Sequence, residues 1–368
     1  MNVTFEERPS PHGYRIGIAT LDAEKSLNAL SLSMIKALDD RLKAWADDPE
    51  ITCVMLRGNG PKAFCAGGDV VQLVHQCREH PGEVPPLARR FFADEYRLDH
   101  RIHTYPKPFI CWAHGHVLGG GMGLMQGAGI RIVTPSSRLG MPEINIGLYP
   151  DVGGSWFLRR APGRTGLFLA FTAAQVNGSD AIFAGLADVL VPHARKGQVL
   201  EAIGATAWSG EQRADRALLS RILAAAAEGA ERPASKLREH YETIESLMVG
   251  EDLLDIAKRL RTLQSDDAWL QGAAKAFAKG APSSIALTWA LWQRVPRMSL
   301  AEVFRLEYWA SLGFCAHHDF AEGIRAVLVD KDRNPKWQPA TLEEITPAFV
   351  DDHLRERGEM APELVALR

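Results

Sequence analysis

The chain has 368 residues, 46% of them hydrophobic, which is enough to bury the core of one large domain or two. The formal net charge is −3, so no excess of positive charge is present to neutralise a polyphosphate backbone, and this argues against a nucleic-acid partner. The five cysteines are spread singly, without a C-x-x-C pair. They predict free thiols in a reducing compartment rather than disulfides or a zinc knuckle.

The N-terminal residues M-N-V-T-F-E-E-R match neither a secretory signal nor an Arg-rich transit peptide. No apolar stretch reaches the roughly 18 residues that indicate a membrane span. We therefore expect a soluble, cytoplasmic protein without a membrane partner.

The first elements alternate strand and helix. Residues 14–21 alternate apolar and polar positions, as in a strand, and residues 31–47 have the spacing of an amphipathic helix that Ser31 can cap. Residues 51–57 form a short apolar run typical of a strand buried on both faces. A strand, a helix and a strand in this order predict a right-handed parallel crossover.

The same alternation continues to about residue 195. Helices are expected near 70–78 and 87–103, a strand at Phe109–Ala113, and a glycine-rich turn at 119–123 that opens a short helix. Arg131–Thr134 reads as another strand, and Ala181–Val191 as a passage from helix to strand. We therefore assign this part of the chain to the α/β class.

Beyond residue 198 strand signals nearly vanish. Residues 198–280 are expected to be mostly helical, followed by helices at 283–295 and 299–328 and by a polar tail at 330–340 that is interrupted by proline. We therefore divide the chain into an α/β core at 1–197, which carries the active site, and a mostly helical C-terminal region at 198–368.

Two glycine-rich loops are candidates for binding negative charge. One is A-F-C-A-G-G-D, Ala63–Asp69, and the other is Gly119–Gly123. Each loop precedes a helix, so its backbone N–H groups can approach a ligand. The plainer alternative for each is a tight turn between a strand and a helix. A dinucleotide fold is not indicated, because the glycines do not give G-x-G-x-x-G in register.

Two acids stand in the apolar, glycine- and proline-rich stretch M-P-E-I-N-I-G-L-Y-P-D-V-G-G, residues 141–154. Glu143 and Asp151 with apolar neighbours have what acid–base catalysis needs, because burial and a nearby charge can separate two carboxyl pKa values. The structural alternative makes Glu143 a first-turn helix residue and Asp151 a helix N-cap.

Other polar residues give weaker signals. Glu95 lies in F-F-A-D-E-Y-R, where a solvated helix face is the plain explanation for an acid. The twelve histidines, among them His114, His116 and the adjacent His317 and His318, show no metal-binding spacing, so we interpret them as structural and expect no metal. No G-x-S-x-G elbow of a serine hydrolase is present.

Together and in this order, A-F-C-A-G-G-D, P-K-P-F-I-C-W-A-H-G-H-V-L-G-G-G-M-G and M-P-E-I-N-I-G-L-Y-P-D-V-G-G resemble the crotonase (enoyl-CoA hydratase/isomerase) superfamily. The resemblance implies a spiral of β-β-α units and a coenzyme A thioester substrate. It also implies an oxyanion hole made by the amides of Gly68 and Gly120, and it assigns Ala66 and Asp69 to binding of the coenzyme A moiety.

One departure from the pattern of the superfamily's hydratases narrows the expected function. Hydratases of the superfamily usually carry an acid two residues after the glycine triplet, where this chain has Gly123, and hydration needs one group to activate water and another to protonate carbon. Glu143 matches the second hydratase acid, and Asp151 adds a carboxylate eight residues later. This exchange, with Glu95-Tyr96, A-P-S-S-I-A-L-T, M-S-L-A-E-V-F-R-L-E-Y and the segment 318–339, resembles the 3-hydroxyisobutyryl-CoA hydrolase branch.

By this resemblance, Glu95, Gly120, Glu143 and Asp151 contact the substrate, and the chain hydrolyses a short hydroxyacyl-CoA ester of valine degradation. No separate cofactor is expected, since coenzyme A is part of the substrate. An enoyl-CoA hydratase or isomerase and a non-catalytic coenzyme A-binding protein stay open as alternatives, as does the formation of a homo-oligomer.

Overall fold

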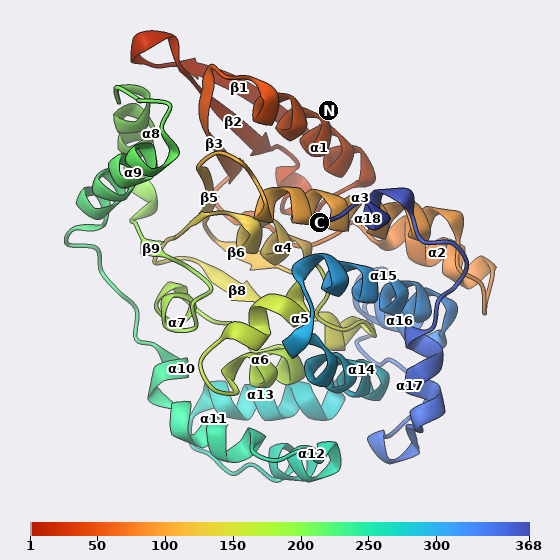
Figure 1. Ribbon diagram of the computed structural model, residues 1–368. Coiled ribbons are helices and arrows are strands. Elements are labelled where there is room, and N and C mark those ends of the chain that lie inside the picture. Colours follow the sequence, from red (N-terminus) through yellow and green to blue (C-terminus); the bar gives the residue numbers. More distant parts are fainter. Residues whose placement is uncertain (1) are drawn as a thin grey trace. The chain divides into compact units, whose positions relative to one another are not determined.

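The computed structural model describes residues 2–368, which form two compact units, each built from segments that are far apart in sequence (Figure 1). The first unit contains the residues up to Gly68, Arg101–Leu139 and Val176–Ser235. The second contains Asp69–His100, Gly140–Gln175 and Lys236–Arg368. The division into domains at residue 197 rests on the change in sequence character and stays a prediction.

The first unit contains a sheet with the strand order β1-β2-β3-β5-β7-β9. Strands β1 and β2 are antiparallel, and the other neighbouring pairs are parallel. The predicted parallel crossover through strand, helix and strand is therefore confirmed. The bounds are Val3–Pro9, Arg15–Leu21, Ile51–Gly58, Phe109–Ala113, Ile130–Val133 and Val189–Leu190.

Helix α1 (Leu32–Asp47) packs on one face of this sheet. It begins as predicted, since the Ser31 side chain accepts a hydrogen bond from the amide of Met34, and its apolar face is buried. The ring of Trp45 lies so close to Gly17 that a Cβ there would be 2.9 Å from ring carbons. A larger residue on β2 at this point would displace the helix.

Ile16 and Ile18, the neighbours of Gly17 on β2, point to the opposite face of the sheet, as the two-residue period of a strand requires. Ile16 and Ile18 join a core with helices α8 (Lys196–Gly204) and α9 (Gln212–Ala227), which are drawn in green in Figure 1. Other members of this buried core are Cys53, Met55, Ile110, Trp112, Ile132, Val191, Val199, Leu200, Ile203, Trp208, Leu219 and Leu223. Residues beyond 197 therefore complete the core of the first unit.

A smaller sheet, with the order β4-β6-β8, carries the glycine loops. Its strands are Ala63–Cys65, His116–Leu118 and Arg138–Gly140, and helix α4 (Gly120–Gly127) follows β6 after one residue. Helix α7 (Gly178–Phe183) precedes β9 and begins with a capping box made by Asn177 and Asp180.

The second unit is mainly helical (Figure 1). Its helices are α2 (Val71–Glu79), the part of α3 (Pro86–His103) up to His100, α5 (Gly154–Phe157), α6 (Thr165–Thr172), α10 (Lys236–Glu239), α11 (Tyr241–Met248), α12 (Leu253–Arg261), α13 (Ala268–Lys279), α14 (Pro282–Arg294), α15 (Leu300–Ala316), α16 (His318–Ile324), α17 (Pro347–Leu354) and α18 (Pro362–Val365). The 3-10 turn η3 (Glu143–Ile146) joins them.

One expected helix is wrong in its extent. The stretch 299–328 is not continuous, because His317 has an extended backbone (φ −114°, ψ 171°) that ends α15 and starts α16, and Arg325–Val329 then form a π-helical turn. The His317 ring supports the break, since its Nδ1 lies 2.7 Å from the carbonyl oxygen of Gly313.

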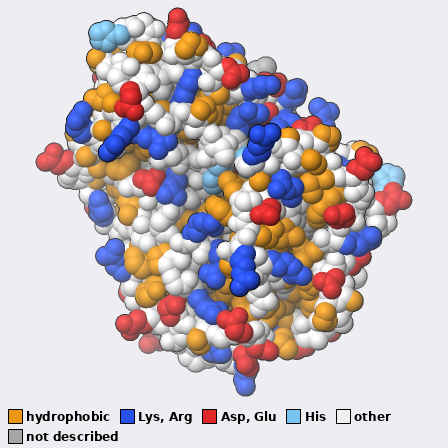
Figure 2. All heavy atoms as spheres, viewed as in Figure 1, with side chains coloured by type: hydrophobic (Ala, Val, Ile, Leu, Met, Phe, Trp, Pro, Cys, Tyr) orange, Lys and Arg blue, Asp and Glu red, His pale blue; other side chains and the backbone are white. Residues whose placement is uncertain are grey.

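Acidic and basic side chains are interspersed on the face shown in Figure 2, as a net charge near zero suggests. Within residues 2–368, no helix combines the length and the apolar character needed to cross a bilayer.

Candidate active site

The first unit brings the two predicted glycine loops together. Gly67 has φ +110°, a conformation that suits glycine, and its carbonyl oxygen accepts a hydrogen bond from Leu30. A Cβ on Gly67 would lie 3.5 Å from the carbonyl oxygen of Leu118 and 4.0 Å from the amide nitrogen of Gly120. The loops after β4 and β6 are therefore neighbours.

Both loops depend on close backbone packing. A Cβ on Gly121 would lie 2.4 Å from the carbonyl oxygen of Cys65, so only glycine fits there. Gly120 is the first residue of α4, where backbone N–H groups have no partner within the helix. Gly68 is half-buried beside Leu30. Such amides can stabilise a carbonyl oxygen that gains negative charge.

The two residues expected to bind coenzyme A differ in exposure. Ala66 is half-buried, and its amide already donates to the carbonyl oxygen of Leu27, so only its carbonyl is left for a ligand. Asp69 is exposed. Both assignments stay predictions.

The second unit brings together the three predicted acids. Glu143 begins η3, Asp151 lies between η3 and α5, and Glu95 lies on α3. All three side chains are 3–4% exposed. Asp151 is not a helix cap, since Gly153 holds the N-cap position of α5 and Asp151 accepts a hydrogen bond from Tyr96 instead. The plain alternative for Glu95, a solvated helix face, is wrong because the residue is buried.

Burial of these carboxyl groups raises their pKa values. Burial and the charge of Asp151 hold the pKa values of Glu95 and Glu143 well above their usual range. Burial also raises the pKa of Asp151, but the Tyr96 hydroxyl at 2.7 Å and the backbone stabilise the ionised form, so this pKa reaches only about 6. The Tyr96 hydroxyl therefore favours the carboxylate form of Asp151, whereas burial favours the protonated forms of Glu95 and Glu143.

The sequence analysis missed two further buried acids. Asp99 is fully buried one helical turn after Glu95, and neither of its carboxylate oxygens has a hydrogen-bond partner within residues 2–368. Its burial and the charge of Glu95 raise its pKa well above the usual range. Glu307 of α15 is also fully buried, and burial raises its pKa to about 8 against the effect of two amide hydrogen bonds. In the sequence, only the spacing of one helical turn between Glu95 and Asp99 could have suggested Asp99, and no pattern suggested Glu307.

Hydrogen bonds between hydroxyl groups connect Asp151 to the backbone of Glu307. The Tyr96 hydroxyl lies 2.7 Å from Oγ of Ser311 as well as from Asp151, and the Tyr149 hydroxyl lies 3.0 Å from the same Ser311. Tyr149 also donates to the carbonyl oxygen of Glu307, at 2.7 Å. The network orients Asp151 and keeps its hydroxyl donor in place.

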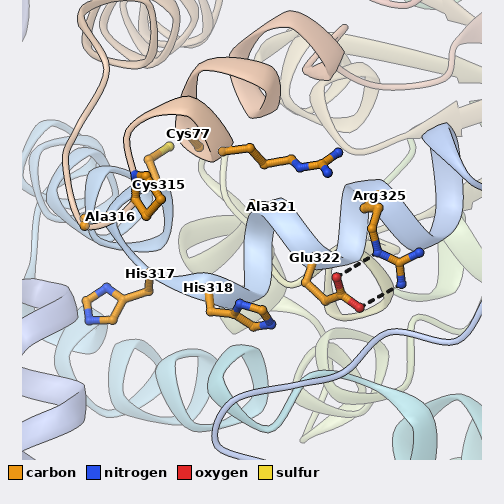
Figure 3. A pocket seen from close by; sticks show the side chains of 11 residues that line it. Cys77, Cys315, Ala316, His317, His318, Ala321, Glu322 and Arg325 are labelled. Atoms are coloured by element: carbon orange, nitrogen blue, oxygen red, sulfur yellow. Dashed lines mark hydrogen bonds and ion pairs between the residues drawn. The ribbon is translucent and has the colours of Figure 1, made fainter.

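A separate cavity of about 330 Å³ opens in the second unit, between the end of α2 and the α15–α16 junction (Figure 3). Cys77 and Cys315 face it, and Glu322 and Arg325 form an ion pair at 2.8 Å on its wall. No residue predicted for catalysis or binding is among the described residues that line it.

One group of side chains has the spacing of metal ligands. Ligand atoms of Glu239, His240 and Asp267 lie close together. However, the ammonium of Lys236 lies 2.7 Å from Asp267 and 2.9 Å from Glu239, so it already neutralises these acids. We interpret the group as an ion-pair network.

Comparisons with known proteins identify the family of the chain. The family model described as enoyl-CoA hydratase/isomerase matches residues 16–354. Among curated proteins, the chain is 38% identical to the mitochondrial 3-hydroxyisobutyryl-CoA hydrolase of Gallus gallus, over 93% of this chain and 87% of that protein. It is 33% identical to the protein of that name from Homo sapiens, over 93% of this chain and 86% of that protein.

Solved structures share the fold over almost the whole chain. A crystal structure described as a carnitinyl-CoA dehydratase from Mycobacterium thermoresistibile has a TM-score of 0.85 and 37% identity, and it covers 99% of this chain and 98% of that one. One described as an enoyl-CoA hydratase from Rhodobacter sphaeroides has a TM-score of 0.83 and 34% identity, with 96% and 97% covered. The predicted crotonase-type α/β fold with a helical C-terminal region is thus confirmed, and the chain belongs to the enoyl-CoA hydratase/isomerase family of the crotonase superfamily.

Proposed function

We propose that this chain hydrolyses the thioester bond of a short hydroxyacyl-CoA, with 3-hydroxyisobutyryl-CoA, an intermediate of valine degradation, as the first candidate substrate. The observation that carries the proposal is the burial of Glu143 and Asp151 in the same unit, with the Tyr96 hydroxyl donating to Asp151 at 2.7 Å and so favouring its ionised form. One group that takes a proton and one that gives a proton are what hydrolysis of a thioester requires.

The proposed reaction combines the predicted oxyanion hole with the two acids. The amides of Gly68 and Gly120 donate hydrogen bonds to the thioester oxygen and so stabilise the negative charge that develops on it, a contribution of typically about 3 kcal/mol per donor. A water molecule attacks the carbonyl carbon and gives a proton to Asp151. The carbon–sulfur bond breaks, and the thiolate of coenzyme A takes a proton from Glu143. The products are a carboxylic acid and free coenzyme A, and transfer of a proton from Asp151 to Glu143 through solvent restores the starting state.

A second route assigns Glu143 as the nucleophile that forms a mixed anhydride, which water then cleaves. In this route Glu143 reacts as a carboxylate; burial raises its pKa and so opposes ionisation, and Asp151 is the base that takes up its proton. A single turnover in oxygen-18 water separates the routes: label in the Glu143 carboxylate supports the anhydride, and an unlabelled side chain supports direct attack by water.

An acyl-CoA panel assayed for thiol release tests the proposal. We expect 3-hydroxyisobutyryl-CoA and close relatives such as 3-hydroxypropionyl-CoA to release thiol faster than the corresponding unhydroxylated esters. The alternative activity is hydration or isomerisation of an enoyl-CoA, and one of the two solved structures is described as an enoyl-CoA hydratase. It predicts loss of crotonyl-CoA absorbance without thiol release. A non-catalytic protein would bind acyl-CoA tightly and turn over none of the esters.

The hydratase alternative lacks one acid. The position two residues after the glycine triplet is Gly123, which is buried inside α4 and carries no side chain to move a proton. Glu143 alone still allows proton transfer in an isomerase, so thiol release is the decisive measurement.

Substitution of the two acids is the matching prediction. Glu143→Ala and Asp151→Asn should each lower kcat by at least about a hundredfold, because each removes a proton-transfer group from the transition state. Binding of a non-hydrolysable thioether analogue, measured by calorimetry, should persist in both variants. Near-normal turnover in either variant would remove that residue from the mechanism.

A further inference from the structure

We propose that Glu307, on α15, is a positioning residue that holds Asp151 by binding two backbone amides of the turn that follows it. The inference rests on the proposed catalytic role of Asp151 and adds a residue that acts through the backbone next to Asp151. It is carried by the geometry of residues 151–155 and by the hydrogen bonds that α15 makes to them.

The turn after Asp151 has a strained backbone. Val152 has φ +52°, in the left-handed region that β-branched residues rarely adopt, and it is buried. Gly153 follows with φ +83°, and the carbonyl oxygen of Asp151 accepts a hydrogen bond from Gly154 at 2.6 Å. A left-handed valine costs of order 1–3 kcal/mol and persists only where the surroundings fix it.

Glu307 supplies that constraint. Its Oε2 accepts the amide N–H of Gly153 at 2.7 Å, and its Oε1 accepts that of Ser155 at 3.1 Å. The residue is fully buried, so water cannot replace these bonds without a rearrangement. One carboxyl group thus holds the two amides that flank Gly154, and through them the backbone of Asp151.

The same helix also fixes the side chain of Asp151. Ser311, one turn after Glu307, lies 2.7 Å from the Tyr96 hydroxyl that donates to Asp151 Oδ2. Tyr149 joins the two positions, since its hydroxyl donates to the Glu307 carbonyl oxygen and lies 3.0 Å from Ser311. Movement of α15 would therefore disturb both the backbone and the hydroxyl donor of Asp151.

A purely structural role for Glu307 makes a different prediction from a positioning role. A structural residue changes the fraction of folded protein and leaves the pKa of Asp151 alone. Loss of a positioning residue weakens the hydrogen bond from Tyr96, and this raises the pKa of Asp151 because that bond stabilises its ionised form. The ionisable groups affected by the charge of Asp151 are Glu95, Tyr96, Asp99, Glu143, Tyr149, Glu307 and Cys315.

The test compares E307A and E307Q with the wild-type chain in thiol release across pH 5–9. For E307A we expect kcat to fall by about tenfold or more, KM to stay within about threefold, and the acidic limb of the pH profile to move to higher pH. E307Q keeps one carbonyl oxygen for one amide, so its kcat and acidic limb should be intermediate. E302Q is the matched control: Glu302 is an exposed acid of the capping box on the same helix, and its loss should leave kcat and the pH profile unchanged.

Hydrogen–deuterium exchange gives a second readout that needs no turnover. A peptide covering residues 151–157 contains both bound amides, and its exchange should accelerate in E307A more than that of peptides from α14. If the wild-type chain releases no thiol from any ester, the proposed function fails, but this exchange still decides the role of Glu307. Unchanged exchange in 151–157, or an unshifted acidic limb with kcat lowered only in proportion to the folded fraction, would overturn the inference.

Discussion

The hydroxyl of Tyr96 donates a hydrogen bond to Asp151, and its removal should change the pKa of Asp151 in a predictable direction. It stabilises the ionised carboxylate and so opposes the effect of burial, which leaves the pKa of Asp151 at about 6. In Tyr96→Phe the pKa of Asp151 should rise, by about one to two units if the bond to a charged group contributes about 1.5–3 kcal/mol. Activity that needs ionised Asp151 should then fall already at neutral pH, seen as an acidic limb shifted upward in the profile of kcat/KM.

Tyr149→Phe is the control for this variant. Tyr149 is as buried as Tyr96 and belongs to the same network, but it bonds Ser311 and the Glu307 carbonyl oxygen rather than Asp151. Its loss should cost stability and should shift the acidic limb less than the loss of the Tyr96 hydroxyl, because the hydrogen bond from Tyr96 to Asp151 remains. Equal shifts in both variants would show that the limb does not report the bond between Tyr96 and Asp151.

Glu95 carries the prediction on selectivity. Its carboxyl group is buried, and burial raises its pKa; this favours the protonated form, which can both donate to and accept from a substrate hydroxyl. Glu95→Ala should reduce the preference for 3-hydroxyacyl over plain acyl-CoA by about tenfold, because one hydrogen bond to the hydroxyl is lost. Glu95→Gln, which keeps a donor and an acceptor, should retain most of the preference. Selectivity that is unchanged in both variants would contradict this role.

At the residue scale, the sequence predicted the acids that stand in unusual surroundings. Glu143 and Asp151 could be found because glycine, proline and apolar residues surround them. Glu307 and Asp99 lie in ordinary helical sequence, where an acid usually faces water, and only tertiary packing shows that they are buried. The hydrogen bonds that hold Asp151 join residues far apart in sequence, so no local pattern could have placed them.

At the scale of elements, the turn η3 that carries Glu143 depends on one glycine. Gly147 ends this turn with φ +68°, and a Cβ on it would lie 2.1 Å from the carbonyl oxygen of Asp319 at α16. Gly147→Ala combines backbone strain with a clash against backbone and should lower the free energy of unfolding by about 2–5 kcal/mol. Urea unfolding followed by circular dichroism measures this change.

Gly272→Ala is the matched substitution. Gly272 lies on the exposed side of α13, and a Cβ there meets no atom within 4 Å. Alanine favours the helix over glycine, so this variant should gain up to about 1 kcal/mol of stability. A loss of stability as large as that of Gly147→Ala would mean that the close approach at Asp319 is not what makes glycine necessary at 147.

The elements with a regular pattern of apolar residues were predicted well, whereas the other elements depend on tertiary contacts. The strand before the first crossover, α1 with its Ser31 cap, and β3 follow local patterns that the tertiary structure keeps. No proline or glycine at His317 predicts the break between α15 and α16. The break lies where the ring of His317 bonds the carbonyl oxygen of Gly313. Strands β4, β6 and β8 have only three residues each, too few to show a period.

At the scale of the whole molecule, each compact unit is built from segments that are not consecutive in the sequence. The core of the first unit includes Leu200, Ile203, Trp208, Leu219 and Leu223, all beyond the predicted boundary at residue 197. In the second unit, the turn from Asp151 to Ser155 is held by Glu307, and Tyr149 stacks on Phe314 with ring centres 5.6 Å apart. Composition changes at residue 198, but each unit obtains part of its core from the helical region.

This interleaving predicts that a truncated chain ending at residue 197 cannot fold on its own. It lacks the apolar side chains of α8 and α9 that cover one face of the large sheet, and it leaves the Gly153 and Ser155 amides without Glu307. Because both cores lose buried area together, we expect a chain with no cooperative urea transition and little near-ultraviolet circular dichroism, in contrast to the full chain purified in parallel. A sharp transition in the truncated chain would instead establish residues 1–197 as an independent domain, and the helices that follow would then be an addition to a core that is already complete.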